Sequence, residues 1–555
     1  MKKQLFYNGT ILTMEEEGRQ VEAVYVEDGK IKEVGSFDKL KEFEKEKDVQ
    51  RIDLHGYTML PAFIDSHSHI VELAAILRFG QLNMAMNFQE IVKIMKEKKE
   101  QVLLEQEQKN KEGRKEREEG QAKVPWIIGF GYDHNLLKEG RHPDKFVLDE
   151  IAKDVPILII HASGHMGVLN SKGLALAGIT KETKDPIGGK IGRVSGGSEP
   201  NGYLEESAFM KVASHMEEEG GDIVSFFQKA QNIYFQYGIT TAQDGLTKEG
   251  GLKLLKQLNE NDILKIDVVS YIDIKDSSHL IKENEEYEKR YKKHLKIGGY
   301  KLFLDGSPQG RTAWLSKPYV KQEGQDSDYC GYPIYTKEQV EEFVRKAKEE
   351  ELQLLTHCNG DRAIDQLLEA QKEPSTMRNV IIHAQTMRLD QLEKVKYDKM
   401  IPSYFVAHVY YWGDTHIKNL GMERANKISP AGSTEKKDII FTFHQDTPVI
   451  LPNMLETIWC AVNRKTRDGV LLDQEECLSV YDALKAVTIN GAYQYFEEEE
   501  KGTISIGKRA DFVILSDNPL EIEKESIKDM TVMATYKDGE LVYQKEEGET
   551  LIACF

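Results

Sequence analysis

The chain has 555 residues, of which 40% are hydrophobic and 30% are charged, and its formal net charge is −19. This composition is typical of a soluble globular protein, and the length allows a large core and several domains. Because phosphates are repelled by so acidic a chain, the charge excludes an electrostatic partnership with nucleic acid.

The sequence indicates neither export nor membrane insertion. The apolar run near the first residue is far too short for a secretory signal, and no stretch reaches the roughly 18 apolar residues of a membrane span. The five cysteines are scattered and show no CxxC spacing, which is typical of unpaired thiols in a reducing compartment. We therefore expect a cytoplasmic protein with a small-molecule substrate and no membrane partner. The oligomeric state is left open, with a homodimer as one alternative.

The two ends of the chain carry the same strand signal. Residues 24–34 and 533–543 each alternate in strand fashion around an Asp-Gly turn, and residues 510–515 form an apolar strand. Matching hairpins at both ends predict one small β domain assembled from residues 1–59 and 496–555.

The middle of the chain, residues 60–495, alternates apolar strands with amphipathic helices and predicts a parallel α/β domain. It is longer than a bare barrel of about 250 residues, so we expect insertions at about 89–122 and 180–220. The first is rich in Lys, Glu and Gln and predicts a solvated helix. The second contains the Gly-rich residues 185–202, which we interpret as a loop or flap. The apolar segments interpreted as strands include residues 125–130, 156–160, 266–271, 300–304, 353–356, 380–382 and 439–443.

Two histidines follow the first apolar segment of this domain. Residues 61–69 read Pro-Ala-Phe-Ile-Asp-Ser-His-Ser-His, so His67 and His69 are separated by one residue. Because side chains alternate along a strand, both imidazoles point the same way and can hold one metal ion. Two surface histidines near a loop explain this pair alone equally well, so the metal interpretation requires ligands at later strand ends.

Later apolar strands supply such residues. His357 and His383 each end an apolar strand, and Asp446 follows another. Lys301 lies inside a strand that runs on to Asp305. Any one of the histidines could be a core residue with satisfied hydrogen bonds. Because the carboxyl ends of barrel strands converge on one face, the residues together predict a metal centre.

With these motifs the chain resembles metal-dependent amidohydrolases of the YtcJ-like branch, which includes N-substituted formamide deformylase. Beyond the HxH segment, the resemblance rests on residues 163–179 (Ser-Gly-His-Met-Gly-Val-Leu-Asn-Ser…), 237–245 (Tyr-Gly-Ile-Thr-Thr-Ala-Gln-Asp-Gly), 301–313 (Lys-Leu-Phe-Leu-Asp-Gly-Ser…Arg-Thr-Ala) and 502–513 (Gly-Thr-Ile-Ser-Ile-Gly-Lys-Arg-Ala-Asp-Phe-Val). It implies a (β/α)8 TIM barrel with insertions, plus a small β-sandwich built from both termini.

The resemblance also implies a site with two divalent metal ions, with zinc as the expected metal. One ion would be bound by His67, His69 and Asp446, and the second by His357 and His383. A carboxylated Lys301 would bridge them, because an ammonium group cannot ligate a cation, and Asp305 is the rival bridging group.

Substrate contacts are harder to assign. We interpret His165 and Arg311 as substrate-binding residues, and purely structural hydrogen bonding explains each equally well. The aromatic-rich residues 402–414 and the pair His444-Gln445, where relatives often carry Gly-Ser, leave the substrate open.

The leading hypothesis is a hydrolase of the EC 3.5 class that cleaves a non-peptide C–N amide bond of a small molecule. A metal-activated hydroxide would attack the carbonyl, and Asp446 would serve as general base and then general acid. One alternative is a mononuclear deaminase, although no HxxE follows His357. Another is a non-catalytic barrel homologue, although every expected ligand position is filled.

Overall fold

The computed structural model describes residues 2–45, 48–83, 85–111, 125–134, 136–162, 164, 166–186, 188–213, 223–321 and 327–546. Contacts within the chain divide it into two compact units. Unit 1 contains residues 1–73 and 230–551, and unit 2 contains residues 74–229 with 552–555. Within the described ranges, none of the helices is long and apolar enough to cross a membrane.

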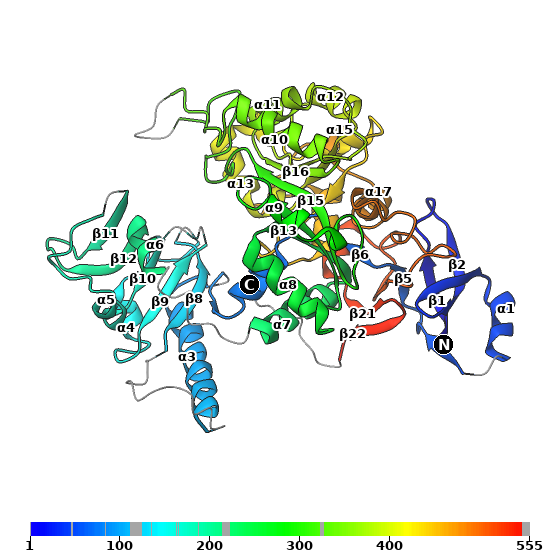
Figure 1. Cartoon of the computed structure of the whole chain (residues 1–555), viewed down its shortest axis with the longest axis horizontal. Helices are drawn as coiled ribbons and strands as arrows, with labels where there is room; N and C mark the ends of the chain where they lie inside the picture. Colours follow the sequence, from blue (N-terminus) through cyan, green and yellow to red (C-terminus); the bar gives the residue numbers. More distant parts are fainter. Residues whose placement is uncertain are drawn as a thin grey trace. The chain divides into compact units, whose positions relative to one another are not determined.

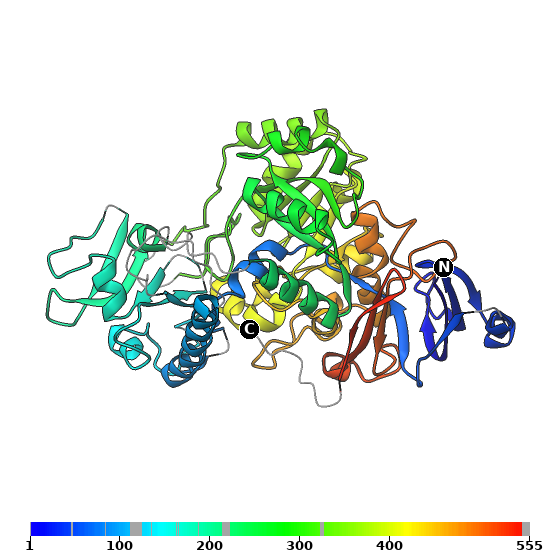
Figure 2. The same ribbon diagram turned by 60° about the horizontal axis from the view of Figure 1, so that its bottom comes forward.

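Both ends of the chain build one sheet of unit 1. Its strands follow the order β22-β21-β20-β5-β1-β2-β3, with β4 also paired to β1. In Figures 1 and 2 the red C-terminal strands lie close to the blue strand β5, which pairs antiparallel with β20. The strands are β1 (Lys3–Leu12), β2 (Gln20–Glu27), β3 (Lys30–Gly35), β4 (Val49–Asp53), β5 (Thr58–Pro61), β20 (Phe512–Leu515), β21 (Val532–Lys537) and β22 (Glu540–Gln544).

The predicted hairpins at the two ends are confirmed, since β2 pairs antiparallel with β3 and β21 with β22. Both turns are Asp-Gly pairs with positive φ, at 49° and 73° for Asp28 and Gly29 and at 50° and 73° for Asp538 and Gly539. Such turns match the right-handed twist of the flanking strands, which is why the dipeptide is a reliable hairpin signal. Phe6 of β1 packs edge-on against rings of β20 and β21 in the core.

A second sheet of unit 1 is wholly parallel and curls so that its first and last strands approach each other. Its strand order is β19-β18-β17-β16-β15-β14-β13-β6. Ser66, just beyond β6, donates a hydrogen bond of 2.8 Å to the carbonyl of Phe443 in β19. A parallel sheet whose strands alternate with helices along the chain confirms the predicted α/β class. The strands are β6 (Phe63–Ile64), β13 (Ile239–Thr247), β14 (Asp267–Asp273), β15 (Leu295–Phe303), β16 (Gln353–Cys358), β17 (Val380–His383), β18 (Ile401–Tyr404) and β19 (Thr442–Phe443).

Helices alternate with the parallel strands along the chain. The capping box of Thr336 and Gln339 shows how the sequence starts one of them, because each side chain bonds the backbone of the other at the first turn of α10. The helices outside unit 2 are α1 (Phe37–Leu40), α8 (Glu249–Glu260), α9 (His279–Lys282), α10 (Lys337–Glu349), α11 (Asp361–Gln371), α12 (Gln391–Tyr397), α13 (His408–Leu420), α14 (Met422–Ala425), α15 (Ala431–Glu435), α16 (Met454–Asn463), α17 (Val480–Ala486) and α18 (Ile489–Gln494). Helices α2 (Ile70–Ile76) and α7 (Ile223–Gln236) contain the boundaries between the units.

A buried ion network joins the two sheets of unit 1. Asp267, at the start of β14, lies 3.0 Å from the Nζ atom of Lys537 in β21 and 2.7 Å from that of Lys501. Arg509 completes the group at 2.9 Å. The four side chains connect the parallel sheet with the terminal one.

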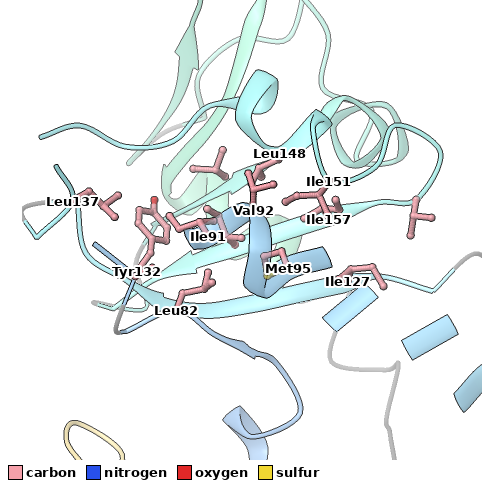
Figure 3. Close-up of a cluster of buried hydrophobic side chains, with 14 residues drawn as sticks. Leu82, Ile91, Val92, Met95, Ile127, Tyr132, Leu137, Leu148, Ile151 and Ile157 are labelled. Carbon is pink, nitrogen blue, oxygen red and sulfur yellow. The ribbon is translucent and has the colours of Figure 1, made fainter. Parts of the chain in front are cut away.

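Unit 2 has its own sheet, in the order β11-β12-β10-β9-β8-β7. Figure 3 shows Ile91, Val92 and Met95 of α3 packed against Ile127 and Ile157 of the sheet, in a cluster of buried apolar side chains. Its elements are β7 (Gly80–Gln81), α3 (Phe88–Lys111), β8 (Ile127–Tyr132), α4 (Lys145–Asp149), β9 (Ile157–His161), β10 (Met166–Leu169), α5 (Ser171–Leu176), β11 (Gly189–Arg193), β12 (Pro200–Glu206) and α6 (Ser207–Ala213).

The sequence predictions for this segment are confirmed in part. The solvated helix expected at about 89–122 is α3 as far as Lys111, and residues 112–122 lie outside the described residues. The predicted strands at 125–130 and 156–160 overlap β8 and β9. These two strands belong to the sheet of unit 2 and not to the long parallel sheet, because a strand's apolar pattern does not specify the sheet it joins. The Gly-rich residues 185–202 include two strands, β11 and β12, joined by a turn. The predicted domain bounds, 1–59 with 496–555 and 60–495, stay a prediction.

Candidate metal centre

His67 and His69 lie where β6 gives way to a loop, and both rings face the same carboxylate. The Nε2 atom of each histidine is 3.3 Å from Oδ1 of Asp446. The N–H of His69 donates a hydrogen bond of 2.7 Å to the carbonyl of Thr447, which fixes the loop after β6 against the loop after β19. The two imidazoles converge as expected, but β6 ends at Ile64, so the loop after the strand places them and not the alternation of side chains along a strand.

Three more histidines form a chain across the ends of β16, β17 and β19. Nδ1 of His357 is 3.0 Å from Nε2 of His383, and Nδ1 of His383 is 3.1 Å from Nε2 of His444. Ser403 of β18 lies 2.8 Å from the remaining nitrogen of His444. Nε2 of His383 also lies 3.9 Å from Oδ2 of Asp446, so the two groups of histidines share one carboxylate.

His444 is a residue of the site that the sequence analysis did not place among the candidate ligands. Its place just after an apolar strand and two residues before Asp446 was the available signal. The structure puts its ring in direct contact with His383 and 5.2 Å from the ring of His67, measured between centroids.

Lys301 is fully buried in β15 beside the first histidine pair. Its Nζ atom lies 3.0 Å from Nε2 of His67 and 5.0 Å from the centre of the Phe303 ring. Burial lowers the pKa of Lys301 to about 7, against the opposing attraction of Asp446. A substantial fraction of this lysine is therefore an uncharged amine near neutral pH.

Asp305, the rival bridging group, has its carboxylate occupied by backbone donors. Its Oδ1 accepts the N–H of Asn359 at 2.9 Å, and its Oδ2 accepts those of Gly360 and Trp314 at 2.7 and 2.9 Å. The bonds from Asn359 and Gly360 fix the start of the loop after β16, and Oδ1 of Asp305 lies 3.7 Å from Nε2 of His357. The geometry therefore favours Lys301 over Asp305 as the group next to His67.

Neighbouring residues fix the ring of His67. Gln243 donates from its amide nitrogen to the Ser66 carbonyl and to Tyr495, so its oxygen must accept from Nδ1–H of His67, at 2.5 Å. This tautomer leaves Nε2 unprotonated, 3.0 Å from Nζ of Lys301 and 3.3 Å from Oδ1 of Asp446, and an unprotonated nitrogen is what a metal ligand requires. A Cβ atom at Gly245 would lie 2.5 Å from Cε1 of His67, so only glycine leaves room for the ring.

The donor atoms fit a divalent metal ion. Ligands at 2.0–2.2 Å in tetrahedral geometry are about 3.4 Å apart, which matches the two distances from Oδ1 of Asp446 to the imidazoles. By geometry, no described residue donates a hydrogen bond to this buried oxygen. His67, His383 and Asp446 also place one donor atom each within 4.8 Å of the others.

The backbone is unusual at two of these residues. His383 and Asp446 adopt left-handed conformations, with φ of 71° and 54°. Residues other than glycine rarely do so, and the cost of about 1–3 kcal/mol each is borne mainly at functional sites. Burial raises the pKa of Asp446, but the adjacent histidines, His383 first, outweigh burial and hold that pKa well below its usual range.

The structure describes only one of the two predicted substrate contacts, Arg311. His165 lies outside the described residues. Arg311, also with positive φ at 60°, donates hydrogen bonds to the side chain of Asn419 at 3.2 Å and to the carbonyl of Val320 at 2.9 Å. Its guanidinium thus helps to hold the loop that follows β15.

Aromatic side chains from α13 and from the turn before it pack beside His444. Phe405 lies 5.5 Å from His444, 4.7 Å from His408 and 5.8 Å from Trp412, measured between ring centroids. Tyr410 instead packs against Trp459. The structure thus brings His67, His69, Lys301, His357, His383 and Asp446 together, and their roles as ligands stay predictions.

Known proteins share the sequence and architecture of the chain. The profile of the family described as "Amidohydrolase family" matches residues 50–543. The chain is 29% identical to the putative amidohydrolase YtcJ of Bacillus subtilis (strain 168), over 98% of this chain and 100% of that protein. It is 26% identical to the N-substituted formamide deformylase of Arthrobacter pascens, over 98% and 99%. The crystal structure of an uncharacterized metal-dependent hydrolase from Pyrococcus furiosus superposes with a TM-score of 0.72, at 26% identity over 94% of this chain and 100% of that one.

Proposed function

The chain belongs to the amidohydrolase family, and from that premise we propose that it hydrolyses a non-peptide C–N amide bond of a small molecule. The observation that carries the proposal is the convergence of three histidine nitrogens on the carboxylate of Asp446, with the buried Lys301 beside them. A parallel sheet whose edge strands meet through Ser66 supports a closed (β/α)8 barrel, and the terminal sheet supports a β-sandwich.

The donor atoms divide into two proposed sets. His67, His69 and Asp446 would hold one divalent ion, and His357 and His383 would hold a second, with zinc as the proposed metal. Ions bound in this way lower the pKa of water and polarise a carbonyl group. His444 and Gln243 would orient their ligands, since each hydrogen-bonds the second nitrogen of a proposed ligand.

Lys301 is the proposed bridge after carboxylation. Its uncharged amine would attack carbon dioxide, forming an N–C bond and releasing one proton, to give an anionic carbamate with two oxygen donors. Complete burial and the 3.0 Å distance to Nε2 of His67 support this assignment.

Asp446 is the proposed proton carrier. As a carboxylate beside the proposed ligands, it could accept a proton from the attacking water. It would then deliver that proton to the nitrogen of the leaving amine. The aromatic rings of Phe405 and Trp412 would contact the apolar part of the substrate. His165 and Arg311 stay proposed as its polar contacts.

One observation favours a second candidate, a mononuclear deaminase-type reaction. His67, His383 and Asp446 alone form a compact three-donor set that a single ion could occupy. Such an ion would leave His357 to bind the substrate instead of a metal.

A panel of N-formyl and N-acyl amines tests the proposal. We expect turnover of at least one member, and a loss of about 10²–10⁴-fold in Asp446→Asn because general acid–base catalysis is removed. The matched control is Asp262→Asn, since Asp262 is an exposed aspartate that pairs only with surface Lys293 in the described structure. Wild-type turnover in Asp446→Asn would overturn the role of Asp446.

A further inference from the structure

A second group of potential metal ligands lies entirely within unit 2. Strands β8 and β9 are parallel neighbours, and Tyr132 at the end of β8 is paired with His161 at the end of β9. Asp133 and His134 follow Tyr132 directly, so they emerge at the same edge of the sheet as His161. Carboxyl ends of adjacent parallel strands thus gather two imidazoles and one carboxylate, just as in the centre around Asp446.

Three atoms of this group lie almost at the corners of an equilateral triangle. Nδ1 of His134 is 3.2 Å from Nε2 of His161, and these nitrogens are 3.7 and 3.6 Å from Oδ1 of Asp133. The circle through the three atoms has a radius of about 2.0 Å, and zinc lies 2.0–2.2 Å from such ligands. An ion slightly out of the plane of the triangle would reach all three at normal bond lengths, with no side-chain movement.

The surroundings orient the rings for this purpose. His142 stacks on His134 with 3.9 Å between centroids, and Nδ1 of His142 lies 3.1 Å from the hydroxyl of the buried Tyr132. Tyr132 also packs edge-on against His161, at 5.2 Å. His134 is thus held by the ring of His142, and His161 by the ring of Tyr132. Rings that are already fixed lose less conformational entropy when they bind an ion.

The charge state also suits a metal. Neutral imidazole is the form that ligates, and Asp133 supplies the negative charge that compensates a cation.

We propose that Asp133, His134 and His161 bind one divalent transition-metal ion, with zinc as the ion to test, at a site of unit 2 that is additional to the centre around Asp446. The three protein donors leave a fourth tetrahedral position for water or an oxygen or nitrogen atom of a ligand. The imidazoles select a transition metal over calcium or magnesium, which prefer oxygen donors.

The test counts zinc ions per chain in the full-length protein, stripped with a chelator and reconstituted with zinc. The double variant Asp133→Asn/His134→Ala is expected to bind one ion fewer than the wild type. The control His55→Ala removes an exposed histidine of unit 1 and is expected to keep the full count. Equal counts in the wild type and the double variant would overturn the proposal.

A second measurement guards against misfolding. Asp133→Asn alone preserves the size of the side chain, so its circular dichroism is expected to match that of the wild type. Its affinity for one equivalent of zinc should fall at least about tenfold. When cobalt replaces zinc, the visible absorption of Asp133→Asn should be weaker than that of the wild type by the contribution of the cobalt ion bound to Asp133, His134 and His161. A well-folded Asp133→Asn with an unchanged cobalt spectrum and unchanged zinc affinity would refute the site.

Discussion

The carboxylate of Asp267 is the centre of the ion network that joins the two sheets of unit 1, and Asp267→Asn removes its charge. Asp267 is fully buried, and its Oδ2 lies within 3.0 Å of three cationic groups. Burial alone raises the pKa of Asp267, but the three cations outweigh burial and hold the pKa well below its usual range. Asparagine keeps the shape and leaves the cations with less compensating charge.

The magnitude follows from the cost of breaking a buried ion network. Removing one partner from such a network costs about 3–5 kcal/mol, because uncompensated charge stays buried. Unfolding entropy of about 2.1 cal/mol/K per residue gives about 0.8 kcal/mol/K for the roughly 400 residues of unit 1. A loss of about 4 kcal/mol therefore lowers the melting temperature of unit 1 by about 5 °C.

Thermal unfolding followed by calorimetry measures this change. The exposed Asp262→Asn, which also breaks an aspartate–lysine pair, is expected to melt like the wild type. The pKa of Asp267 is lower in the folded protein than in the unfolded chain, where it is about 3.9. The stability that this difference provides is fully present above pH 3.9 and is lost as the pH falls through the folded-state pKa. The difference between wild type and Asp267→Asn should thus be constant from about pH 6 to about pH 8. A shift below about 1 °C would refute the reasoning.

Three further predictions concern the candidate metal centre. Gln243→Leu removes the acceptor for Nδ1–H of His67 and is expected to weaken metal binding about 10–100-fold, measured by competition with a chromogenic chelator. Gly245→Ala places a methyl group against the same ring and should release metal more readily than Gly250→Ala, where the space is open; equal retention would contradict the packing argument. Lys301→Met should abolish the proposed bridge and lower the metal count, and added short-chain carboxylates should restore part of it; an unchanged count would exclude a bridging role.

Much of the candidate site could be predicted because its residues obey local rules. His67 and His69 lie two residues apart in the loop that follows β6, and apolar strands that lead to His357 and His383 indicated their convergence. The Asp-Gly turns at both ends predicted the hairpins, because the turn geometry is a property of the dipeptide.

What the sequence did not provide depends on long-range pairing. Strands β8 and β9 have the apolar pattern of barrel strands, and only their pairing with each other, with β7 and with β10 assigns them to the sheet of unit 2. The three backbone bonds to Asp305 likewise come from loops 9 to 55 residues away, so its capping role could not be separated from a ligand role in the sequence. His444 was missed because its partner, His383, lies on another strand.

A binuclear metal centre around Asp446 requires two divalent ions, so the number of metal ions per chain is the decisive quantity. Elemental analysis should be done on protein purified without chelators or an affinity metal, and carrying Asp133→Asn/His134→Ala so that unit 2 adds no ion. The account predicts close to two divalent ions per chain, falling in Asp446→Asn. A count near one would favour the mononuclear alternative, and a count of zero after addition of zinc and bicarbonate would contradict the account.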